Sequence, residues 1–329
     1  MSDNFEKQTL EVAIATDSNY IVPVTVMLKS LFENNKDMLI TINILYLFSL
    51  TKDSDIEFLD NYITEHGNLC RRLGITDEQL GEVPECRNSK NTYLRLLLPS
   101  ILPTNIHHIL YMDGDIIINK SIEFFCSFDL GNAYIAGAKE TTRFFSDSHC
   151  KELNLPDNFD YFNAGIVLMN IKKMREEQFT TIFFDYIRNY FNVIYNDQDI
   201  LNGTLWENVK YFPPKFNMNF LVEPDAALST WDKEELDEAK KNPVIVHYIG
   251  PMKPWDYLSY HPKTQLWWKY LKLTPFADFK PQNKSLSNFF KKHYLLTVKT
   301  IRYRTSVKLK RKIGKFIPKR IKEVLKNHL

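Results

Sequence analysis

Hydrophobic residues along the first half of the chain alternate between continuous apolar runs and helical faces. Leu10–Ala15 and Ile40–Phe48 are β-rich runs that predict two buried strands. Residues 22–34 and 53–66 repeat apolar side chains at helical spacing, and the second segment opens with Asp and Ser capping residues. Because strands alternate with helices, the pattern indicates a doubly wound, mostly parallel α/β sheet.

The pattern weakens in the middle of the chain and then resumes. Residues 68–90 have little periodicity and are predicted as loop with short elements. Tyr93–Leu102 predicts a helix that ends before Pro103, and His108–Met112 predicts a short buried strand. The second half adds predicted strands at Tyr134–Ala138, Phe162–Met169 and Val244–Tyr248, and helices at Glu177–Tyr190, Lys233–Lys241 and His261–Leu273, whose Trp267, Trp268 and Tyr270 are interpreted as packing residues.

The formal net charge of +2 conceals two very different segments. Residues 281–329 contain 15 Lys and Arg residues and one acid, Glu323, a net charge of +14. Residues 1–280 contain 27 Lys and Arg residues and 39 Asp and Glu residues, a net charge of −12. We therefore predict an acidic globular domain over 1–280 and a basic, partly helical tail over 281–329.

Composition and the start of the chain exclude several protein classes. With 10 Gly, 15 Pro and 4 Cys in 329 residues, collagen-like, low-complexity and disulfide-scaffold proteins are excluded. Met1–Leu10 lacks the apolar segment of a secretory signal, and no window reaches the roughly 18 apolar residues of a membrane-spanning helix. Cys70, Cys86, Cys126 and Cys150 lack metal-site spacing, so we expect free thiols in a cytoplasmic protein.

Asp113-Gly114-Asp115 is the first candidate for chemistry. It directly follows a predicted buried strand, at the carboxyl end of the sheet, where open α/β sheets bind ligands. Residues i and i+2 project the same way, so both carboxylates can reach one hard cation, and the glycine allows a ligand to approach the backbone. Oxygen ligands suit Mg²⁺ or Mn²⁺. An ordinary Asp-Gly-Asp turn is the alternative interpretation.

Three further polar groups accompany these carboxylates. His247 follows a buried run and precedes Gly250 and Lys253, which suits an imidazole ligand followed by a backbone-and-ammonium cradle for a diphosphate. Asp197-Gln198-Asp199 precedes an apolar helix, where simple N-capping is the alternative. Asn163-Ala164-Gly165 brings small residues into a strand, as where a ligand approaches the backbone.

The motifs of several other enzyme classes are missing from the chain. There is no GxGxxG, GxxxxGK[ST], GxSxG or HExxH. Rossmann dinucleotide-binding, P-loop, α/β-hydrolase and zinc-protease functions therefore lack their sequence signatures.

The residues together resemble glycosyltransferase family 8, and in particular the bacterial retaining galactosyltransferases that extend lipooligosaccharide. The resemblance covers roughly residues 10–273 and implies the GT-A fold. It also implies metal-dependent transfer of a hexose, galactose before glucose, from UDP-hexose to a cell-surface glycan, glycolipid or glycoprotein. It rests on six blocks in order, Ala15–Tyr20, Tyr93–Leu96, Leu110–Asp115, Phe162–Gly165, Asp197–Asn202 and His247–Trp255.

The resemblance implies roles for individual residues. Asp113, Asp115 and His247 would bind Mn²⁺, with Mg²⁺ as the alternative metal. Gln198, on the β face of the anomeric carbon of the donor sugar, and Asp197 beside it are the candidate catalytic residues. Besides these five residues, the implied donor-binding residues are Ala15, Thr16, Asp17, Asn19, Arg95, Gly114, Asn163, Ala164, Gly250 and Lys253.

The mechanism and one position are less defined. Gln198 is an amide and a poor nucleophile, so we favour front-face substitution, in which the departing phosphate oxygen takes the acceptor's proton. Relatives commonly carry an acid after the strand predicted at Tyr134–Ala138. The sequence leaves open whether Glu140 or Thr141 takes that position here.

Two other functions are compatible with the same residues. A UDP-sugar hydrolase would use the same metal and donor site, with Asp197 or Glu140 as the only clear candidates for its general base. A non-catalytic scaffold is disfavoured by the complete set of motif residues.

The basic tail interleaves aromatic and aliphatic residues with Lys and Arg. This pattern predicts reversible binding to the anionic inner face of the cell membrane. Docking on the acidic domain and a nucleic-acid patch are the alternatives. No nucleic-acid-binding motif accompanies the charge, so no nucleic-acid partner is expected.

Overall fold

A central sheet organises the molecule. The computed structural model describes residues 7–84, 89–189 (side chains of 143–145 excepted), 195–219, 229–259, 261–289 and 292. Within these ranges seven strands form one sheet in the order β3-β2-β1-β4-β7-β6-β8. The first four are parallel, β7 runs antiparallel to β4 and β6, and β6 pairs parallel with β8. The strands are β1 (Gln8–Ala15), β2 (Met38–Leu47), β3 (Leu69–Ile75), β4 (His108–Met112), β6 (Ile135–Lys139), β7 (Phe162–Asn170) and β8 (Val209–Tyr211).

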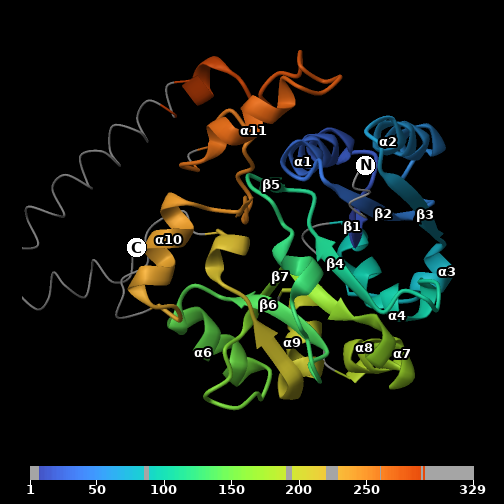
Figure 1. Ribbon diagram of the computed structural model, residues 1–329. Helices are drawn as coiled ribbons and strands as arrows, with labels where there is room; N and C mark the ends of the chain where they lie inside the picture. The colour runs from blue at the N-terminus through green and yellow to red at the C-terminus, as the bar shows by residue number, and fades with distance from the viewer. Residues whose placement is uncertain are drawn as a thin grey trace, which may run out of the picture.

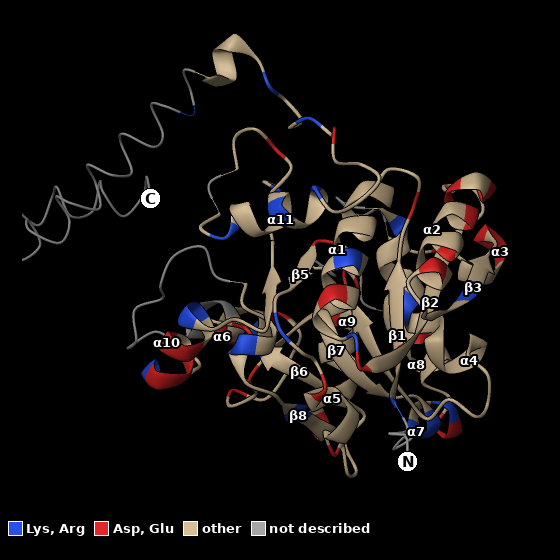
Figure 2. Ribbon diagram, turned by 45° about the horizontal axis from the view of Figure 1, so that its top comes forward, with Lys and Arg blue, Asp and Glu red and all other residues tan. Residues whose placement is uncertain are grey.

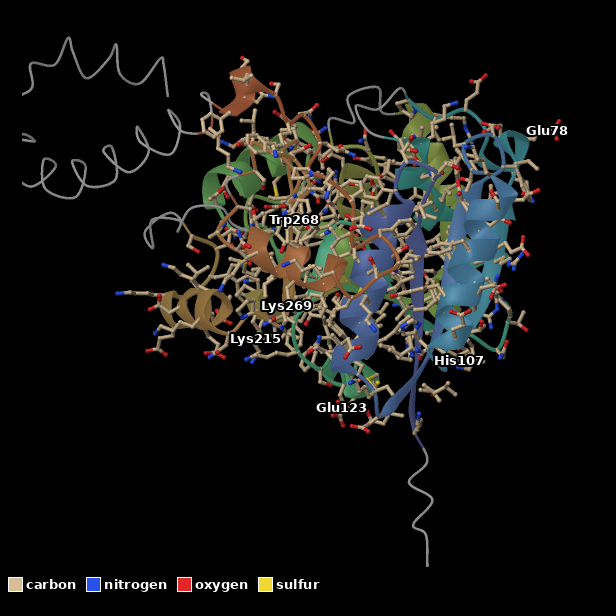
Figure 3. The ribbon with its side chains drawn as sticks, turned by 90° about the horizontal axis from the view of Figure 1, so that it is seen from above. Glu78, His107, Glu123, Lys215, Trp268 and Lys269 are labelled. Carbon is tan, nitrogen blue, oxygen red and sulfur yellow. The ribbon has the colours of Figure 1, made fainter. Side chains whose placement is uncertain are left out.

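Helices cover both faces of this sheet, as Figure 1 shows. One core contains side chains of α1 (Ile21–Asn34), α2 (Asp53–Glu65) and α11 (Thr264–Leu271), and Figure 3 shows α11, with its labelled Trp268 and Lys269, alongside α1. The other core contains side chains of α7, α8 and α9. Successive residues of β4 alternate between the two cores, which explains its uninterrupted apolar run. The remaining helices are α3 (Asp77–Leu80), α4 (Leu98–Ile101), α5 (Phe124–Ser127), α6 (Arg143–Glu152), α7 (Ile171–Glu176), α8 (Phe179–Asn189), α9 (Asp197–Leu205) and α10 (Lys233–Lys241), with 3₁₀ turns η1 (Lys90–Leu97), η2 (Trp206–Asn208) and η3 (Pro214–Phe216).

A small second sheet brings two distant segments together. β5 (Ile116–Ile118) follows the Asp113-Gly114-Asp115 turn and pairs antiparallel with β9 (Ile245–His247). The register places Ile116 opposite His247. This pairing carries His247 to the carboxyl end of β4.

The predicted mostly parallel α/β sheet is confirmed, and two local predictions are corrected. The loop with short elements predicted over 68–90 is confirmed, and the elements are β3 and α3; β3 is an edge strand whose side chains are partly exposed, so it lacks an apolar pattern. The first residues of the helix predicted at Tyr93–Leu102 form η1, and only the last turn is α-helical. α2 is preceded by Lys52, with no side-chain cap, while Asp53 and Asp55 favour its N-terminus electrostatically.

Several other features are as predicted. Trp267 and Tyr270 of α11 are buried in the core, and α10 has the predicted bounds. Figure 2 shows acidic residues along α2 and α3, in keeping with the negative charge of residues 1–280. Among the described residues no helix is long and apolar enough to cross a membrane. The described cysteines, Cys70, Cys126 and Cys150, are free thiols. Cys86, Tyr190 and most of the basic tail, residues 290, 291 and 293–329, lie outside the described residues.

Candidate active site

Three ligand-type side chains converge at the carboxyl end of β4. Asp113, Asp115 and His247 each offer an atom within 4.8 Å of the others. His247 Nε2 lies 3.3 Å from Asp115 Oδ1 and 3.7 Å from Asp113 Oδ2. Their positions follow from the chain path, because the turn after β4 leads into β5 and β5 pairs with the strand that ends at His247.

Lys253 compensates the charge of Asp115. Its ammonium group contacts Asp115 Oδ2 and donates a hydrogen bond to the carbonyl of Tyr248 at 3.0 Å. Burial raises the pKa of the Asp115 carboxyl, but the opposing charges around it, that of Lys253 above all, hold that pKa well below its usual range. Asp115 is therefore ionised in this arrangement.

Arg95 lies beneath the same cluster and is almost completely buried. It pairs with Asp113 at 2.7 Å and with Asp197 at 3.0 Å, and it donates to the carbonyl of Ala164 at 2.6 Å. Its guanidinium carbon also lies 3.8 Å from the ring centre of Tyr111. Arg95 thus joins Asp113 to Asp197.

Asp197 does not act as a simple N-cap. α9 begins at Asp197 itself, and the preceding Asn196 makes no side-chain cap. The Asp197 carboxylate instead contacts Thr92 and Arg95. Burial raises the pKa of Asp197 to about 6, although the charge of Arg95 lowers it.

A cavity of about 240 Å³ adjoins the cluster. Asp17 is held at its edge by hydrogen bonds from the Asn19 backbone at 2.9 Å and from Asn91 Nδ2 at 3.3 Å. The predicted residues that line the cavity are Ala15, Thr16, Asp17, Arg95, Asp113, Gly114, Asp115 and Lys253. Asn19 lies instead on an adjoining hollow of about 450 Å³, which Asp17 also lines.

At Gly165 and Gly114, neighbouring side chains leave no room for a Cβ atom. A Cβ on Gly165 would lie 2.2 Å from His247 Cε1, and one on Gly114 would lie 2.8 Å from Val24 Cγ2. Gly250 is different, because its φ of +84° favours glycine while the space around its α-carbon is open.

A group of amides lies beside the carboxylate cluster. Gln198 Oε1 accepts hydrogen bonds from Asn163 Nδ2 and from the Ala164 backbone, both at 3.0 Å. Asn163 Nδ2 also donates to Glu140 Oε1 at 3.1 Å, whereas the Thr141 hydroxyl is buried and bonds Asn219. Of the two residues that the sequence left open, Glu140 is therefore the one in contact with this group.

Sequence reasoning missed several residues of this region. Thr92 and Tyr111 line the cavity and belong to or adjoin recognised blocks, so their proximity in sequence could have indicated them. Asn91 and Asn217 are buried and contact Asp17 and His247, respectively. Nothing in the local pattern around Asn217 indicates that contact.

Comparison with known proteins identifies the family. The family model "Glycosyl transferase family 8" matches residues 11–259. A lipopolysaccharide 1,2-glucosyltransferase of Escherichia coli is 27% identical over 265 residues, which are 78% of this chain and 76% of that protein. A putative glycosyltransferase of Haemophilus influenzae is 28% identical over 251 residues, 75% of this chain and 73% of that protein.

A solved structure shows the same fold. The galactosyltransferase LgtC, in complex with donor and acceptor sugar analogues, superimposes with a TM-score of 0.70 at 23% identity. The superposition covers 81% of this chain and 96% of that one, which confirms the expected GT-A-type architecture. Because the family model extends over most of the sequence, the chain is a glycosyltransferase and belongs to glycosyl transferase family 8.

Proposed function

We propose that the chain transfers galactose or glucose, with retention of configuration, from UDP-hexose to a cell-surface glycan, glycolipid or glycoprotein. The observation that carries this proposal is the convergence of Asp113, Asp115, His247 and Lys253 beside a cavity that Asp17 also lines. The names of the relatives, lipopolysaccharide glucosyltransferases and a galactosyltransferase, support a hexose and a surface glycan.

The cluster has the chemistry of a divalent-cation site. It combines two carboxylates with an imidazole, and Asp115 Oδ1 is buried and accepts no hydrogen bond from the described residues. An orphaned acceptor of this kind is costly unless a cation satisfies it. Asp113, Asp115 and His247 would hold Mn²⁺ or Mg²⁺. When bound, the cation would neutralise charge on the diphosphate leaving group.

The other predicted residues would bind the donor. Ala15, Thr16, Asp17 and Asn19 would hold the nucleoside, with Gly250 and Lys253 on the phosphates. The Lys253 ammonium, which now contacts Asp115, borders the cavity and can exchange this carboxylate for a phosphate oxygen. Asn163, Ala164, Asp197 and Gln198 would face the sugar.

Front-face substitution suits this set of side chains. The carbonyl oxygen of Gln198 already accepts two hydrogen bonds, and Asp197 is paired with Arg95, so neither is well placed to act as a nucleophile. The bond from the anomeric carbon to the phosphate oxygen would break as the acceptor hydroxyl attacks from the same face. The acceptor's proton would pass to the departing phosphate oxygen.

UDP release from UDP-galactose and UDP-glucose, measured with Mn²⁺ and a panel of glycans, tests the proposal. We expect one donor to be preferred and release to depend on an acceptor. Asp115→Asn should abolish metal-dependent donor binding, while Asp60→Asn, which alters an exposed pair with Arg72, serves as the control. Undiminished release without acceptor would indicate the hydrolase instead. Absence of any rise in Tm with UDP-hexose and Mn²⁺ would favour the scaffold.

We also propose that the basic tail binds an anionic membrane surface from the cytoplasmic side. Its net charge of +14 and interleaved aromatic residues support this proposal. The first tail residues touch the globular domain, because the Gln282 backbone donates to the Trp255 carbonyl at 2.9 Å and Lys292 Nζ donates to the Tyr257 carbonyl at 2.6 Å. A truncation that tests the tail should therefore follow Lys292.

A further inference from the structure

Asn217 is a buried amide that lies between the carboxylate cluster and the amides around Gln198. It follows η3 and is 2% exposed. Its Oδ1 lies 2.9 Å from His247 Nδ1, and its Nδ2 donates to Asn163 Oδ1 at 2.9 Å. No role has been assigned to Asn217 in the proposed function.

A backbone group determines the direction of these bonds. The Gly165 N–H can only donate, and it donates to Asn163 Oδ1 at 3.1 Å. The atom of Asn163 that faces Asn217 is therefore its oxygen, and Asn217 must present its amino group to it. The Asn217 oxygen is then left for His247, and because that oxygen can only accept, His247 Nδ1 carries a proton. The opposite ring nitrogen, Nε2, faces Asp113 and Asp115.

A second backbone group orients the other end of the chain of amides. The Ala164 N–H donates to Gln198 Oε1, which also accepts from Asn163 Nδ2. The oxygen of Gln198 is thereby turned toward Asn163 and Ala164, and its amino group points away from them. Four side chains, Gln198, Asn163, Asn217 and His247, are thus joined by hydrogen bonds that all run in one direction.

We infer that Asn217 is a positioning residue with two effects. It selects the His247 tautomer whose Nε2 lone pair points at the two carboxylates, and through Asn163 it holds the amide of Gln198 in one orientation. The inference rests on the proposed function, since it presumes a cation on His247 and a sugar at Gln198. The inference adds that the metal-binding cluster and the Gln198 side chain are connected by hydrogen bonds that all run in one direction.

The tautomer can be tested in the metal-free protein. With ¹⁵N-labelled histidine, long-range ¹H–¹⁵N NMR distinguishes a protonated Nδ1 from a protonated Nε2, and His247→Gln identifies the signal. We expect the Nδ1–H form of neutral His247 in the unaltered chain. An Nε2–H form would overturn the inference without any variant at position 217, and it would leave the proposed transfer reaction untouched.

Two substitutions separate the two effects. Asn217→Leu removes the acceptor for His247 and should weaken Mn²⁺ binding about 10- to 100-fold, measured by electron paramagnetic resonance without nucleotide. Asn219→Leu alters another buried amide two residues away, which bonds Thr141, and should leave Mn²⁺ affinity unchanged. Equal Mn²⁺ affinity in Asn217→Leu and in the unaltered chain would refute the first effect. If the unaltered chain itself bound no Mn²⁺, the proposed function would fail instead.

Asn217→Asp keeps an oxygen that can accept from His247. It replaces the amino group that donates to Asn163 Oδ1 by a second oxygen, so two acceptors then face each other. We expect Mn²⁺ affinity and the Nδ1–H tautomer to be retained, while kcat falls about 10- to 100-fold at little change in KM for UDP-hexose, because Gln198 loses its fixed orientation. A variant with full kcat would refute the connection to Gln198. This isosteric change also guards against a folding failure of Asn217→Leu.

Discussion

Replacing Gly165 by alanine should disrupt the carboxylate and imidazole cluster while leaving the fold in place. The added Cβ would lie 2.2 Å from His247 Cε1 and 2.7 Å from Asp113 Oδ2. Ordinary van der Waals contact begins at 3.4 Å, so the imidazole must move by about 1.2 Å to relieve the overlap. Both displaced groups belong to the proposed metal site, and His247 is buried.

The expected loss of metal affinity is large compared with the loss of stability. Metal–ligand distances tolerate roughly 0.2 Å, so a shift of about 1 Å removes a ligand. Substitution of residues that only hydrogen-bond to the ligands already lowers metal affinity about 10- to 100-fold. Because a ligand itself is displaced here, we expect Mn²⁺ affinity to fall by at least about 100-fold. Overpacking by one methyl group should lower the free energy of unfolding by about 1–3 kcal/mol.

Mn²⁺ titration by electron paramagnetic resonance, together with urea denaturation, measures both quantities. Gly203→Ala is the matched control, because its Cβ would approach the Tyr186 hydroxyl to 2.3 Å, as close a contact but with a side chain outside the cluster. The control should bind Mn²⁺ normally. A Gly165→Ala protein that binds Mn²⁺ within a few fold of the unaltered chain would refute the reasoning.

Three further predictions follow from buried charge and from the tail. Arg95→Leu leaves Asp197 buried without its partner and should lower the free energy of unfolding in urea by about 3–5 kcal/mol; a loss below about 1 kcal/mol would contradict the role given to this ion pair. Burial raises the folded-state pKa of Asp197 to about 6, above the ordinary value of 3.8, so the folded chain binds this proton more tightly than the unfolded chain. The stabilisation from this proton is then complete below about pH 4, and the free energy of unfolding falls by roughly 3 kcal/mol as pH rises through 6. Asp197→Asn should flatten this part of the plot of unfolding free energy, measured in urea, against pH. Truncation after Lys292 should release the protein from anionic liposomes while turnover of a water-soluble acceptor is kept; retained liposome binding would reject the tail as the anchor.

The site residues that could be predicted from sequence are those that lie next to a recognisable strand in the chain. Asp113 and Asp115 directly follow a recognisable apolar strand, and His247 ends another, so both could be placed at the end of the sheet from pattern alone. The sequence predicts that a ligand approaches the backbone near Gly165, and in the structure the groups close to Gly165 are the side chains of His247 and Asp113. The edge strand β3 escaped prediction because its side chains are partly exposed on both faces and carry no period-2 signal.

The sequence by itself determined the alternation of strands and helices, the acidic and basic segments, and the residue types available for metal and donor binding. These features depend on local periodicity and composition, which do not require knowing which segments become neighbours. Only the tertiary structure decided that Arg95 joins Asp113 to Asp197, that Glu140 contacts Asn163, and that Asn217 meets His247. Those contacts join positions 18 to 102 residues apart, and hydrogen-bond direction depends on the backbone groups that fix each amide.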